Sequence, residues 1–254
     1  MKNENKKSRK QLLAPAQHGS YLDDLFDLTK ELLPKYGGAW NRHSLVTLDV
    51  TAQARLLYYN ELYQKITAVP GVICEVGVHW GATMTQLINL RSIYEPFNHS
   101  RHIYGFDTFE GFPDVHEKDG GVSRPGDLKT LVSYEEKLEQ ILTAIEAFSP
   151  LSHMKKYSLI KGDAGETIND WLDEHPHALI SMAILDMDLY EPTKKVLEKI
   201  IPRLTKGSMI VFDELNCSAF PGETRALDEV FGLNNVKLYR SKFQPYCAYM
   251  IYGE

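Results

Sequence analysis

The chain has 254 residues, of which 43% are hydrophobic and 24% charged, a composition typical of globular proteins and not of disordered ones. Its net charge of −6 argues against a general nucleic-acid-binding protein, and no apolar run approaches the roughly 18 residues that a membrane span requires. The three cysteines, Cys74, Cys217 and Cys247, show no metal-binding spacing, and their odd number favours a reducing cytoplasm. We therefore expect a small cytoplasmic protein.

The sequence divides into three expected parts. Residues 1–18 are expected to form a basic flexible tail, residues 19–70 a helical N-terminal cap, and residues 71–254 an α/β domain. The first ten residues carry a net charge of +4. Because no apolar stretch follows this charge, we do not expect a secretory signal.

Two helices are expected within the cap. Ser20 and Asp23 resemble a capping box, and leucines recur behind them at helical spacing until Pro34 ends the pattern. The second helix is expected over residues 51–66, where the clustered aromatic side chains are interpreted as core and packing surface.

From residue 71 onward, short apolar runs alternate with amphipathic helices. Strands are expected over residues 72–76, 102–106, 157–160, 180–185 and 208–212. Helices are expected over residues 82–90, 133–148, 166–174, 193–204 and 224–231, the second of them opened by a Ser133–Glu136 capping box. Two last runs, 236–239 and 248–252, suggest an antiparallel pair at the sheet edge. The pattern predicts a doubly wound, mostly parallel α/β sheet with helices on both faces.

One segment, residues 114–127, interrupts this alternation. It contains Gly120, Gly121, Pro125 and Gly126 among many charges and has almost no apolar anchor. We expect a long mobile loop, which is either a plain surface loop or a lid over the active site.

Small and acidic residues end the first three strands, where ligands of open α/β sheets bind. Glu75 is followed by Gly77 and Gly81, which allow close approach to the backbone but do not match the G-x-G-x-x-G dinucleotide pattern. Asp107 ends the second strand, where a carboxylate can accept hydrogen bonds from a ribose diol. Asp163 follows the third strand, where it can meet an adenine amino group. Together they favour an adenosine-type ligand.

Four further carboxylates follow the fourth and fifth strands. Asp186 and Asp188 are two residues apart, so an extended strand would place them on one face. Asp213 and Glu214 end the fifth strand. Mutual repulsion of these groups favours a bound cation, and oxygen ligands without nearby histidine or cysteine indicate Mg²⁺ or Ca²⁺.

These segments resemble the class I S-adenosylmethionine-dependent methyltransferases, and among them the macrocin/mycinamicin (TylF/MycF-type) sugar O-methyltransferases. The resemblance covers about residues 45–252. The matching segments are CEVGVHWG (74–81), GFDTFEGFP (105–113), GDAGET (162–167), DMDLY (186–190) and the Asp213-Glu214 pair. The second of them is the most specific.

The resemblance implies a fold, two cofactors and roles for ten residues. The fold is a Rossmann-like seven-stranded sheet with an antiparallel C-terminal edge strand. S-adenosylmethionine would be bound by Glu75, Gly77, Gly81, Thr83, Asp107 and Asp163. Mg²⁺ would be held by Asp186, Asp213 and Glu214, and the general base would be Asp188. Family members usually have Asp-Asp where this chain has Asp213-Glu214, which leaves direct ligation by Glu214 open.

The favoured function is therefore S-adenosylmethionine- and Mg²⁺-dependent methyl transfer to a hydroxyl of a sugar-containing small molecule, by a protein that can form homo-oligomers. A catechol- or phenol-type O-methyltransferase is the first alternative. Such enzymes resemble one another in a lysine base shortly after the first metal-binding Asp, and here no lysine follows Asp186 before Lys194, which disfavours this alternative. A nicotinamide-dependent oxidoreductase is the second alternative, and it is disfavoured because the chain lacks the G-x-G-x-x-G motif. A non-catalytic protein of the same fold is disfavoured by the intact carboxylates, and a hydrolase by the absent G-x-S-x-G motif.

Overall fold

The computed structural model describes residues 16–244 and 246–254, so residues 1–15 of the predicted basic tail lie outside the described residues. Internal contacts divide the chain into two units, Met1–Ala54 and Arg55–Glu254. The elements of the first unit are α2 (Ala16–Leu32), short 3-10 turns at Leu33–Lys35, Gly37–Ala39 and Ser44–Thr47, α3 (Trp40–His43) and the start of α4 (Val50–Ile66). The described residues contain no helix that is both long and apolar enough to cross a membrane.

Neither of the two predicted capping boxes forms. Ser20 lies inside α2, so it cannot cap the start of that helix. Ser133 precedes helix α6 with a φ of 55°, and its side chain makes no capping hydrogen bond. A cap that the sequence analysis missed opens α4, where the Asp49 carboxylate accepts the backbone N–H of Ala52 at 2.7 Å.

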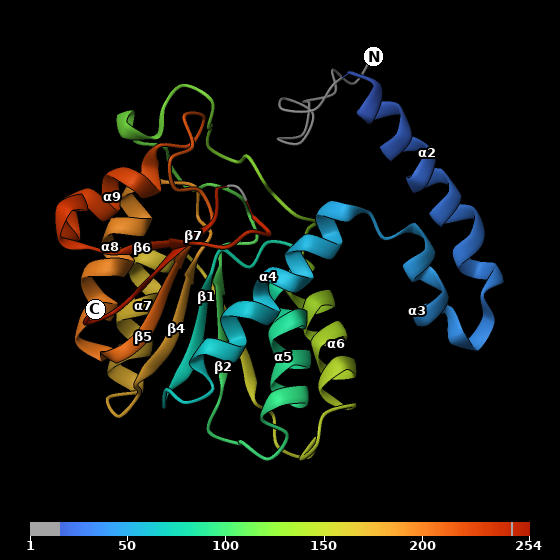
Figure 1. Ribbon diagram of the computed structural model, residues 1–254, viewed down its shortest axis with the longest axis horizontal. Coiled ribbons are helices and arrows are strands. Elements are labelled where there is room, and N and C mark those ends of the chain that lie inside the picture. The colour runs from blue at the N-terminus through green and yellow to red at the C-terminus, as the bar shows by residue number, and fades with distance from the viewer. Residues whose placement is uncertain (1–15, 245) are drawn as a thin grey trace. The chain divides into compact units, whose positions relative to one another are not determined.

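The second unit is built on one seven-stranded sheet with the order β3-β2-β1-β4-β5-β7-β6 (Figure 1). The strands are β1 (Val72–Val76), β2 (Ile103–Asp107), β3 (Tyr157–Lys161), β4 (Ile180–Leu185), β5 (Leu204–Phe212), β6 (Leu238–Arg240) and β7 (Ala248–Ile251). The first five are parallel, and β7 pairs antiparallel with both β5 and β6. The predicted doubly wound sheet and its antiparallel pair are confirmed, with β6 as the outermost strand.

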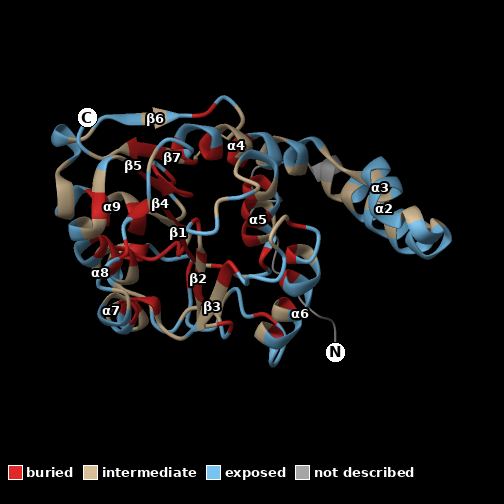
Figure 2. Ribbon diagram, turned by 90° about the horizontal axis from the view of Figure 1, so that it is seen from below, coloured by how far each residue is buried: buried red, intermediate tan, exposed pale blue. Residues whose placement is uncertain are grey.

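Helices cover both faces of the sheet (Figures 1 and 2). One face carries α5 and α6 and the part of α4 that follows residue 54, and the other carries α7, α8 and α9. The bounds are α5 (Ala82–Tyr94), α6 (Tyr134–Glu146), α7 (Ala164–Glu174), α8 (Tyr190–Ile200) and α9 (Gly222–Phe231), with 3-10 turns at Glu117–Asp119, Ile201–Arg203 and Leu233–Asn235. The six residues of β4 are all buried, as a parallel strand covered on both faces must be.

Side chains of the central strands alternate between two apolar clusters. One cluster, with the α4, α5 and α6 side chains, contains Ile184 of β4 and Val211 of β5. The other, with the α7, α8 and α9 side chains, contains their neighbours Leu185 and Phe212. Because successive strand residues point to opposite faces, the residues that follow Leu185 and Phe212 turn back toward the α4 side. These residues are Asp186 and Asp213.

Segment 114–127, expected to be a long mobile loop with almost no apolar anchor, is held by polar contacts. Asp119 is 1% exposed, and its carboxylate accepts the backbone N–H groups of Tyr190 and His116. Lys118 forms an ion pair with Glu229 of α9. The anchor is a buried carboxylate and not an apolar side chain, which is why the hydrophobic pattern did not reveal it.

A buried ion network fastens α5 to α6 and to the segment before β3. Glu146 at the end of α6 pairs with Arg91 of α5 and with Lys156, and the exposed fraction of each side chain is at most 5%. Arg91 also donates to the carbonyl oxygen of Lys156 at 2.6 Å. Removing one partner of such a network leaves an uncompensated charge in a poorly solvated place.

We expect Glu146→Gln to lower the free energy of unfolding by about 3 kcal/mol, since the two cations lose their buried counter-charge. Urea denaturation followed by circular dichroism measures this loss. The matched control is Glu198→Gln on α8, where the side chain is exposed and the expected change is within about 0.5 kcal/mol. A loss for Glu146→Gln as small as that of the control would contradict the role of the network.

Candidate active site

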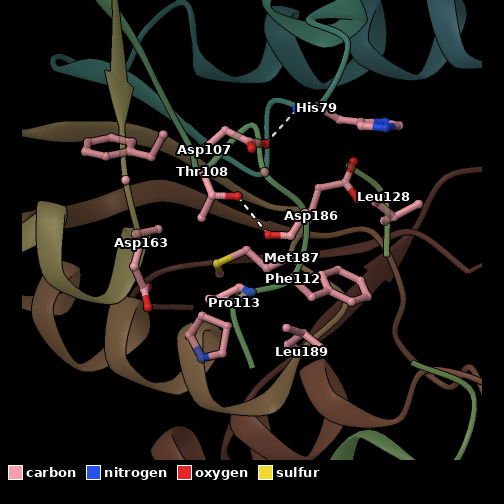
Figure 3. Close-up of a pocket in the computed structure, with 16 residues that line it drawn as sticks. His79, Asp107, Thr108, Phe112, Pro113, Leu128, Asp163, Asp186, Met187 and Leu189 are labelled. Carbon is pink, nitrogen blue, oxygen red and sulfur yellow. Dashed lines mark hydrogen bonds between the residues drawn. The ribbon is translucent and has the colours of Figure 1, made fainter. Parts of the chain in front are cut away.

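A pocket opens at the carboxyl ends of the parallel strands (Figure 3). Four of the ten predicted site residues line it, namely Gly77, Asp107, Asp163 and Asp186. Its remaining lining residues are His79, Phe106, Thr108, Gly111, Phe112, Pro113, Leu128, Gly162, Ala164, Met187, Leu189 and Pro192. The wall therefore combines apolar and aromatic surface with a few carboxylates, as small-molecule sites commonly do.

Asp107 joins the ends of the first two strands. Its Oδ2 accepts the backbone N–H of His79 at 2.7 Å, and its Oδ1 accepts that of Phe109 at 2.6 Å. Both donor residues have positive φ angles, 50° and 56°. Each carboxylate oxygen can accept more than one hydrogen bond, so these contacts fix the orientation of Asp107 and leave it capacity for a ligand.

The two predicted glycines occupy different surroundings. Gly77 has a φ of 97°, and a Cβ built on it would lie 1.9 Å from the backbone oxygen of Asp186. Gly81 has a φ of 77°, and its Cβ would lie 2.3 Å from the Leu138 side chain of α6. Gly77 thus permits the close approach of the β1 and β4 ends beside the pocket, whereas Gly81 permits helix packing.

Asp163 serves as the N-cap of α7. Its Oδ1 accepts the backbone N–H of Gly165 at 2.8 Å, which satisfies one of the free donors of the first helical turn. The same side chain lines the pocket (Figure 3). The capping role and the predicted role near adenine are compatible, because the cap uses one of the two oxygens.

Asp186 and Asp213 share one guanidinium that the sequence analysis missed. Arg55 donates from Nη1 to Asp213 Oδ1 at 3.0 Å and from Nη2 to Asp186 Oδ2 at 3.1 Å. Thr83, predicted to contact the cofactor, lies with its hydroxyl oxygen 3.5 Å from the same Nη2. The spacing of Arg55 with Tyr59 and Leu62 on the buried stripe of α4 was the signal that could have revealed it.

Burial and charge shift several pKa values around this pair. Burial raises the pKa of Glu75 well above its usual value, and the nearby Asp186 adds to the effect. One Glu75 oxygen, Oε2, is buried without a hydrogen-bond partner. Burial alone would lower the pKa of Arg55, but Tyr59, Asp213 and Asp186 raise it overall, so the guanidinium stays charged. Burial also raises the pKa of Cys247, whose Sγ lies 3.0 Å from Asp213 Oδ1.

Asp188 and Glu214 are held through their backbones by one buried acid. Glu223 in the first turn of α9 is fully buried, and it accepts the N–H of Asp188 at 3.3 Å and that of Glu214 at 3.0 Å. Strand β4 ends at Leu185, and Asp188 has a φ of 63°. The alternation expected for an extended strand therefore does not continue to Asp188.

The arrangement does not fit the predicted Mg²⁺ site. Among residues 16–244 and 246–254, no three or more His, Cys, Asp or Glu side chains are grouped as metal ligands. One oxygen of Asp186 and one of Asp213 already accept the guanidinium of Arg55. A divalent ion on these oxygens would lie against a like charge.

The sheet order and the pocket at its carboxyl edge define a class I methyltransferase fold. The chain belongs to the macrocin-O-methyltransferase (TylF) family, whose sequence model matches residues 35–238. The family resemblance predicted from the sequence is thereby confirmed.

Two solved structures of CalS11 are similar over most of the chain. One, described as a calicheamicin methyltransferase, is 36% identical with a TM-score of 0.86, covering 91% of this chain and 93% of that one. The other, an apo structure described as a TDP-rhamnose 3'-O-methyltransferase of calicheamicin biosynthesis, is 33% identical with a TM-score of 0.80, covering 91% and 94%.

A curated relative from Streptomyces olivaceus matches a shorter region. It is the 8-demethyl-8-(2,3-dimethoxy-alpha-L-rhamnosyl)-tetracenomycin-C 4'-O-methyltransferase, 28% identical over 160 residues. The match covers 58% of this chain and 53% of the relative, so the chain spans about half the length of that protein.

We expect Gly77→Ala to disturb the pocket, because the new methyl group would meet the Asp186 backbone and an alanine at this positive φ costs about 1–3 kcal/mol. Thermal unfolding and titration with S-adenosylhomocysteine measure the two consequences, a lower Tm and weaker binding. Gly121→Ala is the matched control, since a Cβ there meets nothing within 4 Å. Unchanged binding and Tm in Gly77→Ala would show that the β1 and β4 ends are not held in contact.

Proposed function

We propose that the protein transfers a methyl group from S-adenosylmethionine to a hydroxyl of a 6-deoxysugar, free, nucleotide-linked or glycosidic. The observation that carries this proposal is the pocket at the strand ends with Asp107 and Asp163 on its wall, in a chain of the macrocin-O-methyltransferase family. CalS11 is described as a TDP-rhamnose 3'-O-methyltransferase, and the substrate of the Streptomyces olivaceus enzyme carries a rhamnosyl group. A rhamnosyl acceptor is therefore the first substrate to test.

In this proposal the cofactor lies along the ends of β1, β2 and β3. Asp107, oriented by two backbone N–H groups, accepts from the ribose hydroxyls, and Asp163 meets the adenine amino group. Gly77 lets the cofactor approach the backbone, and the apolar side chains of Phe112, Met187 and Leu189 line the pocket. Glu75, Gly81 and Thr83 lie outside the lining and keep their predicted cofactor roles as proposals only.

The reaction forms an oxygen–carbon bond, breaks a sulfur–carbon bond and moves one proton. An acceptor oxygen attacks the sulfonium methyl carbon in line, the sulfur–carbon bond breaks, and the hydroxyl proton passes to a base, for which we propose Asp188. Holding two reactants in this geometry supplies much of the rate acceleration. The predicted Mg²⁺ requirement, with Glu214 as third ligand, enters no step here. A cytoplasmic location and a homo-oligomeric state also remain predictions.

The test of this function is a measurement of S-adenosylhomocysteine release with purified protein, S-adenosylmethionine and a set of acceptors. We expect release with TDP-rhamnose or a rhamnosyl glycoside and none with catechol. Each reaction is run with added Mg²⁺ and with EDTA, which tests the metal requirement separately. Release with catechol alone would favour the phenol-type alternative. Formation of NADH in a separate reaction, with NAD⁺ in place of S-adenosylmethionine, would favour the oxidoreductase.

Asp188→Asn should lower kcat by about 10²–10⁴, the usual contribution of a general base, while cofactor affinity stays unchanged. The amide keeps the size of the side chain but cannot take the proton. Single-turnover rates and calorimetric titration with S-adenosylhomocysteine measure the two effects. A kcat within threefold of wild type would remove Asp188 from the base role, and Asp186→Asn then becomes the next variant to measure.

A further inference from the structure

Arg55 bridges two strands through their carboxylates. It lies on α4, its side chain is 29% exposed, and its two Nη atoms donate to Asp213 and Asp186 at 3.0 and 3.1 Å. These acids follow β5 and β4, which are neighbours in the sheet. One planar guanidinium therefore serves two carboxylates at once, which a lysine ammonium on a flexible stem does less well.

The guanidinium also contacts Tyr59, four residues further along α4. Its Nη2 lies 3.2 Å from the hydroxyl oxygen of Tyr59, and its carbon lies 5.2 Å from the centre of the Tyr59 ring. Tyr59 is itself fully buried. Arg55 thus has a fixed position between the aromatic core and the two acids, and it is not a surface side chain that meets them by chance.

The charge around Arg55 explains why a cation is needed there. Glu75 is 1% exposed at the end of β1, the strand beside β4. Without Arg55, Asp186 and Asp213 would face each other beside the buried Glu75 in a poorly solvated region, and the charges of the two aspartates would repel. Carboxylate oxygens are also the ligands that Mg²⁺ and Ca²⁺ take in proteins.

We propose that Arg55 is a positioning residue that acts as the built-in counter-cation of Asp186 and Asp213, and that it competes with divalent cations for these carboxylates. Binding of Mg²⁺ to the two acids then requires displacement of the guanidinium. The proposal concerns the pocket to which methyl transfer is assigned above, since Asp186 lines it. Its test measures cation binding and not methyl transfer, so either proposal can fail while the other stands.

The experiment is a calorimetric titration with MgCl₂ of wild type, Arg55→Met and Lys155→Met. Methionine reaches as far as the arginine stem without a charge or an oxygen ligand. Lys155 pairs with Glu139 on the surface, where its side chain is 54% exposed, so Lys155→Met removes the same net charge away from the site. We expect Arg55→Met to bind one Mg²⁺ at least about tenfold more tightly than wild type, because one nearby positive charge is gone, and Lys155→Met to match wild type.

Further variants keep the result decisive. Asp186→Asn added to Arg55→Met should abolish the gain, which a loss of packing alone would not explain. If circular dichroism shows that Arg55→Met does not fold, Arg55→Lys is measured instead. We then expect an intermediate increase in Mg²⁺ affinity, because lysine keeps the positive charge but lacks the planar guanidinium that bonds both carboxylates. Equal Mg²⁺ affinity in wild type and the Arg55 variant, including no binding in either, would overturn the proposal.

Discussion

The poor solvation of carboxylates at the ends of buried parallel strands is the constraint around which the site is arranged. Glu75 and Asp213 are buried. A carboxylate that stays ionised in such surroundings needs a partner of opposite charge. Arg55 supplies that partner for Asp186 and Asp213. Because the guanidinium comes from α4 and the acids come from the sheet, the same contact that offsets the charge also fixes the helix over the strand ends.

Two further carboxylates, Glu223 and Asp107, orient the neighbouring loops by accepting backbone N–H groups. Glu223 offers its two oxygens to backbone N–H groups after β4 and β5, while Asp107 does the same for the loops after β1 and β2. Four loops are thus oriented by two acids that use main-chain donors and no cation. These bonds go to main-chain groups, so the orientation of the loops does not itself depend on the identity of the loop side chains.

The sequence was sufficient where local pattern decides the structure. The bounds of β1 and β4 were predicted to the residue, and Asp107 and Asp163 were found because strand ends are recognisable from apolar runs. Arg55 was not found. Its spacing with Tyr59 and Leu62 marks it as part of the inward side of α4, but its partners are 131 and 158 residues away and that spacing does not indicate them. The capping boxes failed because Ser followed three residues later by Asp or Glu also occurs where it cannot cap. Ser20 lies inside α2, and Ser133 precedes α6 with a left-handed backbone and without a side-chain capping bond.

The loop after β2 is closed at its base by two backbone hydrogen bonds, Phe112 N–H to Asp127 O at 3.0 Å and Gly126 N–H to Phe112 O at 2.9 Å. Phe112 and Leu128, on either side of this closure, line the pocket. The ends of the segment between them are joined by these hydrogen bonds. The entropy cost of closing a loop rises only slowly with the length of the loop. A substituted or lengthened segment that keeps the buried Asp119 contact with the Tyr190 backbone would therefore leave Phe112 and Leu128 in the pocket wall, so the outer part of this loop can vary in sequence independently of the pocket.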